Sequence, residues 1–239
     1  MKTQIKDFDF NEGHLLNNKY KIISQLGAGW EGEVYSIVEI KTGIIRAAKF
    51  FYPARNSKNK TLIAYAKKLN NLNDAPIIIK YITQEEIDFR EQKILYLVSE
   101  YIDATSLDDY IQNFKNKTIS LFEALHIFYQ LVKGLEQIHL RGEFHGDLHT
   151  GNVLLRQKGL TFEIKLIDLF MWKGNKKEFQ RADIIELINI FYEMLGGKKK
   201  YSKLPVAIKK IICGRNSTLI LKKFPRTSAL SAYLENLTW

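Results

Sequence analysis

Hydrophobic residues alternate with polar residues over short runs in the first third of the chain. Three runs rich in β-branched and aromatic residues are predicted to be strands: 20–25, 33–40 and 44–51. The sequence Lys41-Thr42-Gly43 predicts a hairpin turn between the second and third of these strands. Apolar residues then recur at helical spacing over residues 61–72. Two more short apolar runs follow, at 77–82 and 94–102. The N-terminal part is therefore predicted to be a small sheet with one helix.

The hydrophobic period changes to that of helices after residue 106. Residues 121–140 place their apolar side chains on one stripe, and residues 182–195 are nearly apolar throughout and end at Gly196-Gly197. Two more helices are predicted at 204–213 and 228–237. Two short apolar runs lie between the first two helices, at 152–155 and 162–169. The pattern indicates an α+β protein, with a sheet-rich lobe, a hinge near residues 100–103 and a larger helical lobe.

Composition excludes several classes of protein. The chain has 239 residues, of which 46% are hydrophobic and 26% charged, as in ordinary globular proteins. A single cysteine, Cys213, excludes an internal disulfide framework and a cysteine-based zinc site. No run approaches the length of about 18 uncharged apolar residues needed to span a bilayer, and none resembles a secretory signal at the start. We therefore expect a cytoplasmic protein without a membrane span.

The charge is strongly positive, with 36 basic and 26 acidic residues and a formal net charge of +10. Such a surface attracts nucleotides, nucleic acid, acidic proteins or an anionic membrane face. The excess is concentrated late in the chain, at Lys173, Lys176, Lys177, Arg181, Lys198, Lys199, Lys200, Lys203, Lys209 and Lys210. Solubility alone is the alternative explanation for lysines of this kind.

A glycine cluster, Gly27-Ala28-Gly29-Trp30-Glu31-Gly32, lies between the first two predicted strands. Glycines at this spacing let backbone N–H groups approach phosphate oxygens, although a plain turn is the simpler interpretation. The element that follows is a strand and not a helix, which excludes a dinucleotide-binding βαβ unit. Lys49 lies on the third predicted strand and is a candidate partner for the phosphates.

A second cluster carries more chemistry. The segment His145-Gly146-Asp147-Leu148-His149-Thr150-Gly151-Asn152 follows the helix at 121–140, and Asp168 lies at the end of a later strand. One carboxylate can orient an attacking hydroxyl, while an amide and a second carboxylate hold Mg²⁺ on nucleotide phosphates. Taken singly, Asp147 fits a turn, Asn152 a cap and Asp168 a strand end. Their order, together with the glycines and Lys49, favours nucleotide chemistry.

In these motifs the sequence resembles the protein-kinase-like superfamily, over nearly the whole chain from residue 20 to 237. The resembling segments are the glycine-rich loop at 27–35, the lysine strand at 47–49, the strand into the hinge at 97–102, the catalytic loop at 145–152, the D-F-G-like 168–170 and the central helix from 183. The resemblance implies a bilobal fold: an N-terminal extension at 1–19, an N-lobe at 20–102 and a C-lobe at 103–239.

The resemblance also implies roles in binding ATP and Mg²⁺. The side chains expected around the adenine ring are Leu26, Val34, Ala47, Leu154 and Ile167, with backbone groups of Glu100 and Ile102 pairing with the base. Gly27, Gly29 and Gly32 would cover the phosphates, and Lys49 would contact the α and β groups. Ser99 would gate the back of the adenine pocket.

For catalysis, the resemblance implies that Asp147 is the catalytic carboxylate and that Asn152 and Asp168 bind Mg²⁺. His145 is expected to be a structural, hydrogen-bonded loop residue. Asp183 is flanked by apolar residues on a helix, so we expect its carboxylate to bind the backbone of the catalytic loop and not to take part in chemistry.

The sequence departs from the family pattern around Lys49. The helix at 61–72 offers Tyr65 or Ala66 where the family has the glutamate that pairs with the lysine. Lys49 therefore needs another partner, for which Asp168, Glu85 and Glu86 are the candidates.

Three further departures concern the catalytic segment. Only fourteen residues separate Asp168 from Asp183, so the usual activation segment and its A-P-E motif cannot fit, and Arg226 would lack the glutamate partner of that motif. The loop reads His-Gly-Asp where protein kinases commonly have His-Arg-Asp, and His149 replaces a lysine. The form His-Gly-Asp-Leu-His is shared with aminoglycoside and choline kinases.

We predict an ATP- and Mg²⁺-dependent serine/threonine protein kinase, compact and constitutively assembled, which acts on a protein or on itself. Two alternatives stay open: a small-molecule phosphotransferase and a nucleotide-binding pseudokinase. The basic C-lobe surface predicts an acidic or anionic protein partner, with nucleic acid as a second possibility.

Overall fold

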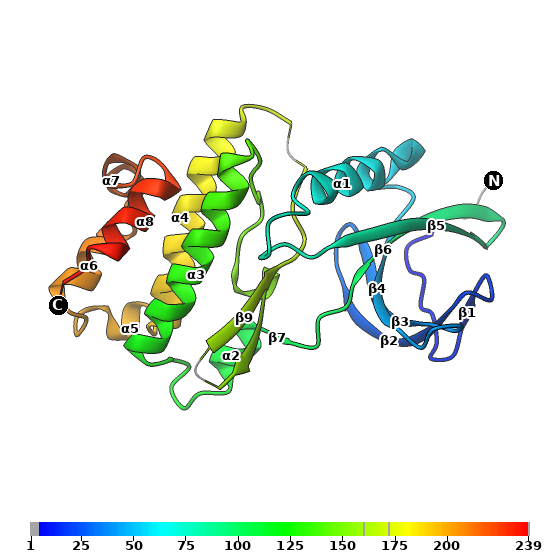
Figure 1. Ribbon diagram of the computed structural model, residues 1–239, viewed down its shortest axis with the longest axis horizontal. Coiled ribbons are helices and arrows are strands. Elements are labelled where there is room, and N and C mark those ends of the chain that lie inside the picture. Colours follow the sequence, from blue (N-terminus) through cyan, green and yellow to red (C-terminus); the bar gives the residue numbers. More distant parts are fainter. Residues whose placement is uncertain (1–4, 160, 172, 239) are drawn as a thin grey trace. The chain divides into compact units, whose positions relative to one another are not determined.

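A sheet and one helix make up most of the first hundred residues (Figure 1). The computed structural model describes residues 5–159, 161–171 and 173–238. In this part, the first sheet has the strand order β1-β2-β3-β4-β6-β5, and every neighbouring pair is antiparallel. Its strands are β1 (Leu15–Leu16), β2 (Tyr20–Ala28), β3 (Gly32–Glu39), β4 (Ile45–Phe51), β5 (Tyr81–Phe89) and β6 (Gln92–Glu100). The 3₁₀ turn η1 (Ser57–Asn59) leads into helix α1 (Lys60–Asn71), which packs on β5 and β6.

Helices dominate the rest of the chain, as the sequence predicts. A three-stranded antiparallel sheet consists of β7 (Thr105–Ser106), β8 (Val153–Lys158) and β9 (Thr161–Leu166). The helices and turns around it are α2 (Leu107–Gln112), α3 (Leu121–Leu140), η2 (Thr150–Asn152), α4 (Lys176–Met194), α5 (Lys198–Tyr201), α6 (Val206–Ile212), η3 (Cys213–Arg215), α7 (Ser217–Lys223) and α8 (Thr227–Glu235). The predicted α+β class, with the sheet first and the helices second, is confirmed.

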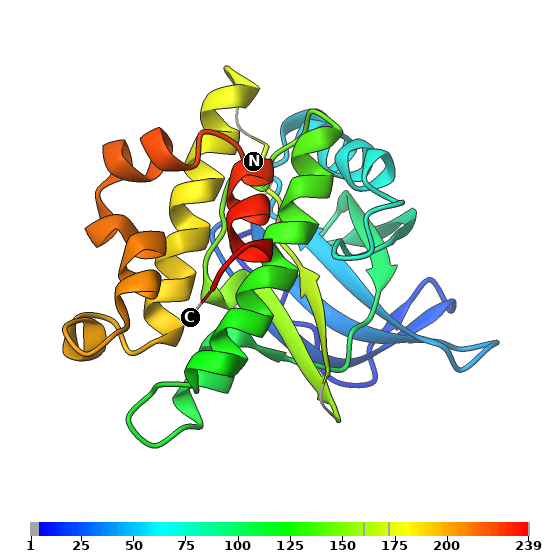
Figure 2. The same ribbon diagram turned by 60° about the vertical axis from the view of Figure 1, so that its left-hand side comes forward.

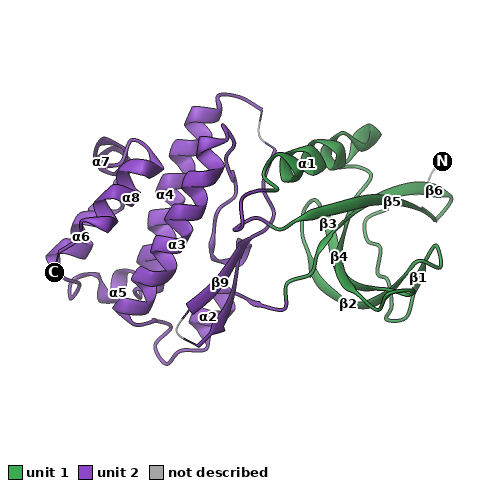
Figure 3. Cartoon of the chain, viewed as in Figure 1, with its two compact units in different colours: residues 1–73, 79–102 green, residues 74–78, 103–239 purple. Residues whose placement is uncertain are grey.

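The chain divides into two compact units, coloured separately in Figure 3. Unit 1 comprises residues 1–73 and 79–102, and unit 2 comprises residues 74–78 and 103–239. The short segment 74–78 therefore joins unit 2, although it lies in sequence between α1 and β5. The apolar run at 77–82 is divided between the units, and its strand begins only at Tyr81.

The segment 74–78 is fixed in unit 2 by backbone and side-chain contacts. The N–H of Leu166 donates to the carbonyl of Ile77 at 2.6 Å, and Ile78 forms a parallel bridge with Leu166. Ile77 also packs against α3 at Gly134, where a Cβ would lie 2.2 Å from its Cδ1 atom. Gly134 therefore makes room on α3 for this segment, and any larger residue would displace it.

The core of unit 2 lies between long helices. The 20-residue α3 has the predicted bounds 121–140 and is capped by Ser120, whose hydroxyl accepts the N–H of Glu123. The Phe128 ring stacks on the Phe191 ring of α4, with a centroid distance of 4.2 Å. In Figures 1 and 2, α3 and α4 run side by side, and α8 packs along α3.

Helix α4 begins earlier than the hydrophobic pattern indicates. The pattern predicts residues 182–195, whereas the helix runs from Lys176 to Met194 and is capped by the Asn175 side chain, which accepts the N–H of Lys177. Its first two turns are mostly exposed and polar, and Phe179, whose ring packs on Phe144 at 4.7 Å, is their one large apolar residue, so they show no apolar stripe. The cap residue, and not hydrophobicity, sets this start. In the described part of the chain, no helix combines the length and apolarity needed to cross a membrane.

Residues of the N-terminal extension that the resemblance places at 1–19 contribute to the core of unit 1. Phe8 and Phe10 are at most 8% exposed and stack on each other, with their rings 5.7 Å apart. Both rings also pack against Phe50 of β4. Burying two aromatic side chains in this way contributes several kcal/mol of hydrophobic stabilisation, about 2 kcal/mol each.

A buried carboxylate ties this N-terminal segment to the sheet. Glu33 on β3 is 2% exposed and accepts the N–H groups of Phe8, at 2.9 Å, and of Asp9, at 3.4 Å. It also accepts the hydroxyls of Tyr35 and, at 3.0 Å, of Tyr52. Burial, together with the hydrogen bond to Glu33, raises the pKa of Tyr52 to about 12, so this phenol stays a donor at physiological pH.

We expect Glu33→Ala to lower the free energy of unfolding by roughly 2–4 kcal/mol, because several buried donors lose their acceptor. Urea unfolding of unit 1, followed by aromatic fluorescence, measures the change. Glu39→Ala at the half-buried end of the same strand is the control and should change stability by no more than about 0.5 kcal/mol. Equal stability of the two variants would show that Glu33 does not hold the segment.

Candidate active site

The glycine-rich turn connects β2 and β3 in unit 1. The N–H of Gly29 donates to the carbonyl of Gly32 at 2.9 Å, which closes the turn. A Cβ on Gly32 would lie 1.9 Å from the Phe50 carbonyl oxygen, so this position requires glycine for close approach to β4. Gly27 and Gly29 have no atom within 4 Å of an added Cβ. The space beside these two glycines is therefore open to a ligand.

Lys49 lies on β4, opposite Val34 of β3. Its side chain is 10% exposed, and its Nζ atom is 3.2 Å from Glu31 Oε2. The ammonium also lies about 5 Å from the ring centroids of Phe51 and Tyr65. Helix α1 thus presents the Tyr65 ring toward Lys49. This agrees with the sequence, which has Tyr65 or Ala66 where the family has a glutamate.

The sequence analysis did not identify Glu31 as a residue that pairs with Lys49. Two of the partners predicted for Lys49 bind other lysines. Glu85 Oε1 lies 2.5 Å from Lys19 Nζ, and Glu86 Oε1 lies 2.7 Å from Lys93 Nζ, so both of these predictions are wrong. Both carboxylates stand on β5, whereas Glu31 stands in the glycine-rich turn. The signal for Glu31 is weak in sequence, because it depends on how the turn folds back toward β4.

The residues expected around adenine in unit 1 lie on adjoining strands. Ala47 on β4 is opposite Ser99 on β6, and Val34 on β3 is opposite Gly27 on β2. Leu26, at the other end of the set, is 47% exposed. The sheet therefore brings these predicted residues onto neighbouring strands.

Strand β6 ends at Glu100, where the sequence predicts hydrogen bonds between the backbone and adenine. The Glu100 N–H donates to the Lys80 carbonyl at 3.0 Å, and Glu100 Oε1 accepts the Lys80 N–H at 2.8 Å. The Glu100 amide is therefore already hydrogen-bonded within unit 1, and Ile102 is the last residue of this unit.

In unit 2, one buried carboxylate holds the start of the catalytic-loop segment. Asp183 on α4 is 2% exposed. Its Oδ2 atom accepts the N–H of His145 at 2.7 Å, and its Oδ1 atom accepts the N–H of Gly146 at 2.9 Å. Asp183 Oδ2 also lies 3.1 Å from His139 Nε2 on α3. The predicted structural role of Asp183 is confirmed.

The side chains of the loop converge on Asp147. Asn152 Nδ2 donates to the Asp147 carbonyl at 2.8 Å and lies 3.4 Å from Asp147 Oδ2. Asn152 is buried, whereas Asp147 is exposed. One amide thus fixes the loop from within, and the Asp147 residue remains exposed to solvent.

The segment after β9 is bound to the same loop by its backbone. The Ile167 N–H donates to the Asn152 carbonyl at 3.1 Å, and the Phe170 N–H donates to the His145 carbonyl at 2.8 Å. The His145 ring nitrogen Nε2 lies 3.0 Å from the Ile167 carbonyl oxygen, which confirms that His145 is a hydrogen-bonded structural residue. Asp168, between these anchors, has the left-handed φ of +56°. This uncommon conformation is among those that aspartate tolerates best, and it is often found at functional sites.

The donor chemistry at Asn152 and Asp168 fits magnesium. Among the described residues, no three His, Cys, Asp or Glu side chains gather into a metal cluster. Mg²⁺ is commonly held by only one or two protein oxygens together with water and phosphates, so a complete protein cage is not needed. An amide oxygen and one carboxylate on hydrogen-bonded segments are such a pair.

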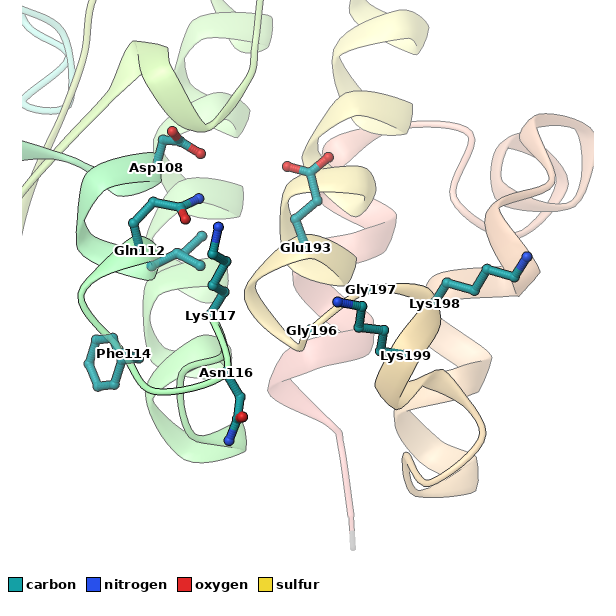
Figure 4. Close-up of a pocket in the computed structure, with 11 residues that line it drawn as sticks. Asp108, Gln112, Phe114, Asn116, Lys117, Glu193, Gly196, Gly197, Lys198 and Lys199 are labelled. Atoms are coloured by element: carbon teal, nitrogen blue, oxygen red, sulfur yellow. The ribbon is translucent and has the colours of Figure 1, made fainter.

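A pocket of about 660 Å³ lies in unit 2 between α2 and the end of α4 (Figure 4). It is lined from α2 and the loop after it and from the end of α4 and α5, and it contains both acidic and basic side chains, including Asp108, Lys117, Glu193 and Lys199. Asp108 Oδ1 accepts the Thr150 hydroxyl at 3.4 Å, which joins α2 to the turn η2. None of the predicted site residues lines this pocket.

Comparison with known proteins identifies a matching family and several similar proteins. The family model described as "Protein kinase domain" matches residues 20–181. Over 236 residues the chain is 25% identical to the probable serine/threonine-protein kinase YbdM of Bacillus subtilis, covering 93% of this chain and 88% of that protein. It is 29% identical over 188 residues to the Cell division control protein 2 homolog D of Antirrhinum majus, covering 75% of this chain. The match spans 59% of the length of the Antirrhinum protein.

A solved structure shows the same fold. A double-mutant form of the PknI kinase domain of Mycobacterium tuberculosis superposes with a TM-score of 0.69, covering 95% of this chain and 97% of that one. The two sequences are 17% identical, so the likeness shows the fold alone.

Proposed function

Because this chain belongs to the protein kinase domain family, we propose that it is a serine/threonine protein kinase, which transfers the γ-phosphate of ATP to a protein hydroxyl. The observation that carries the proposal is the arrangement of the catalytic loop: Asp183 holds the backbone, Asn152 binds Asp147, and Asp168 follows on the adjoining segment. Since ATP is the phosphate donor, the cytoplasm is the compartment in which we propose that the enzyme works.

In this proposal, unit 1 supplies the nucleotide contacts. Leu26, Val34 and Ala47 contact the adenine ring, and the backbone of Glu100 and Ile102 pairs with the base. Gly27, Gly29 and Gly32 cover the phosphates, and Lys49 donates to them. The open space beside Gly27 and Gly29 supports this assignment, because a backbone without Cβ atoms lets phosphate oxygens approach the N–H groups.

Unit 2 supplies the residues for metal and acceptor. Asn152 and Asp168 would hold Mg²⁺, which neutralises charge on the phosphates during transfer. Asp147 would orient the acceptor hydroxyl and accept its proton. The exposure of Asp147 and its fixed backbone support this role, because an acceptor must reach the carboxylate and find it in place.

The short connection between Asp168 and α4 supports constitutive assembly. Helix α4 begins at Lys176, and the Gln180 side chain donates to the carbonyls of His139 and Glu143 at 3.1 and 2.9 Å. The loop contacts described above come from Asp183, Asn152 and backbone groups. These contacts need no phosphorylated side chain, so we propose that activity does not depend on phosphorylation of the segment between Asp168 and α4.

A nucleotide-binding pseudokinase is the second candidate, and the position of Tyr65 favours it. A tyrosine ring, and not a carboxylate, faces Lys49 from α1. In this case the chain binds ATP and transfers nothing. A small-molecule phosphotransferase would instead transfer phosphate to a free hydroxyl compound and not to protein.

We expect Asp147→Asn to reduce phosphate transfer about 100-fold or more, since a positioned carboxylate is lost. The affinity for ATP should change less than about threefold, because Asp147 is assigned to the acceptor. Transfer is measured with radiolabelled ATP and Mg²⁺, with the chain alone and with a generic protein, followed by phosphoamino-acid analysis. Affinity is measured by calorimetry.

Asp88→Asn, on the exposed face of β5, is the matched control and should be fully active. Undiminished transfer by Asp147→Asn would contradict the catalytic assignment. ATP binding without transfer to any acceptor, by the parent chain, would favour the pseudokinase.

We also propose that the acceptor is an acidic protein. Lys173 and Lys177 are exposed near the start of α4, whereas Lys176 already lies 2.7 Å from Glu143. The exposed lysines would attract an acidic acceptor through charge. Nucleic acid is the other anionic partner that they could bind.

If so, the double variant Lys173→Glu and Lys177→Glu should raise the KM for an acidic protein such as casein by about five- to tenfold and leave kcat nearly unchanged. Transfer rates measured over a range of salt should show a weaker salt dependence in the variant. Lys41→Glu, in the β3–β4 turn, is the control. An unchanged KM would assign these lysines to solubility, and salt-dependent binding of nucleic acid with no preference for acidic proteins would favour nucleic acid as the partner.

A further inference from the structure

One carboxylate that pairs with Lys49 comes from the glycine-rich turn itself. Glu31 Oε2 lies 3.2 Å from Lys49 Nζ, and the Glu31 side chain is 23% exposed. Helix α1 contains no acidic residue, and its Tyr65 ring lies beside the ammonium. The Glu31 carboxylate therefore belongs to the segment that, under the proposed function, covers the phosphates.

The backbone of Glu31 is fixed at this place. The Tyr52 N–H donates to the Glu31 carbonyl at 2.9 Å, and the neighbouring Gly32 pairs with Phe51 of β4. Gly32 is in close contact with the Phe50 carbonyl, so the turn fits tightly against β4. Any movement of Glu31 away from Lys49 must therefore be a rotation of its side chain, or it must break backbone hydrogen bonds.

The surroundings of the Lys49 ammonium make a nearby anion important for its stability. The rings of Phe51 and Tyr65 lie on it at about 5 Å, and little of the Lys49 side chain is exposed to water. A charge that is partly removed from water depends strongly on nearby opposite charge. A carboxylate and a phosphate offer the same chemistry, an anionic oxygen that accepts from the ammonium.

We propose that Glu31 occupies the place of a nucleotide phosphate on Lys49, and that it sets the affinity for ATP and ADP by competing with their phosphate groups. This inference rests on the proposed nucleotide site. A phosphate that approaches Lys49 meets the Glu31 carboxylate, and two anions at this distance repel each other. Binding of a phosphorylated nucleotide therefore requires the Glu31 side chain to turn away, whereas binding of adenosine does not.

Glu31→Gln tests this directly, because it keeps the volume of the side chain and removes its charge. We expect ADP and MgATP to bind the variant about three- to tenfold more tightly than the parent chain, the scale of a partly exposed ion pair. The affinity for adenosine should stay the same. Calorimetry with the full chain gives all three dissociation constants, and thermal unfolding without nucleotide shows that the variants are folded.

Two variants complete the design. Glu39→Gln is the matched control, since it makes the same change on β3 at a carboxylate that binds Thr42, and it should leave every affinity unchanged. Glu31→Ala should repeat the tighter binding of ADP if the glutamine variant fails to fold.

The possible results separate the two levels of the argument. Equal or weaker binding of ADP by Glu31→Gln would overturn the competition, and weaker binding would instead mean that Glu31 positions Lys49 for the nucleotide. A gain of the same size for adenosine would also overturn it, because a general loosening of unit 1 would then be the cause. If neither the parent nor the variant binds any adenine nucleotide, the proposed function fails, and this inference fails with it.

Discussion

The hydrogen bonds of the buried Asp183 carboxylate to the backbone of residues 145 and 146 are the constraint on which the candidate site depends. Its two oxygens accept two consecutive N–H groups, at 2.7 and 2.9 Å, from the inside of unit 2. A buried charge of this kind is stable only when its hydrogen bonds are made, so α4 and the loop hold each other in one arrangement. His139 of α3 contacts the same carboxylate and joins the second long helix to the loop.

The rest of the loop follows from this anchor. Once residues 145 and 146 are fixed, the His145 carbonyl accepts the N–H of Phe170, and the Asn152 carbonyl accepts the N–H of Ile167. These two bonds determine where Asp168 lies, without a long activation segment. The short connection to α4 is therefore sufficient for the fold, which explains how a compact chain of this family can keep its loop ordered.

Much of the fold and of the candidate site could be predicted from the sequence, and the predictions that failed did so for physical reasons. Asp183 was predictable because a carboxylate among apolar helix residues must be satisfied by buried donors. The start of α4 was not predictable, since its first turns are mostly polar and show no apolar stripe. Glu31 was not predicted to pair with Lys49, because the contact depends on how the glycine-rich turn folds back toward β4. Glu33 carried an unused signal: it shares the alternation of Tyr35 and Ile37, which both face the core.

Hydrogen exchange of the His145 and Gly146 amides in Asp183→Asn, measured together with phosphate transfer, tests directly whether Asp183 holds the loop in its active arrangement. An asparagine places an NH₂ group against one of the two N–H donors. We expect exchange about tenfold faster or more at these amides, a lower transfer rate and a nearly unchanged ATP affinity, with Glu186→Gln on the same helix behaving as the parent chain. Exchange and transfer at the parent's rates in Asp183→Asn would show that Asp183 does not hold the loop.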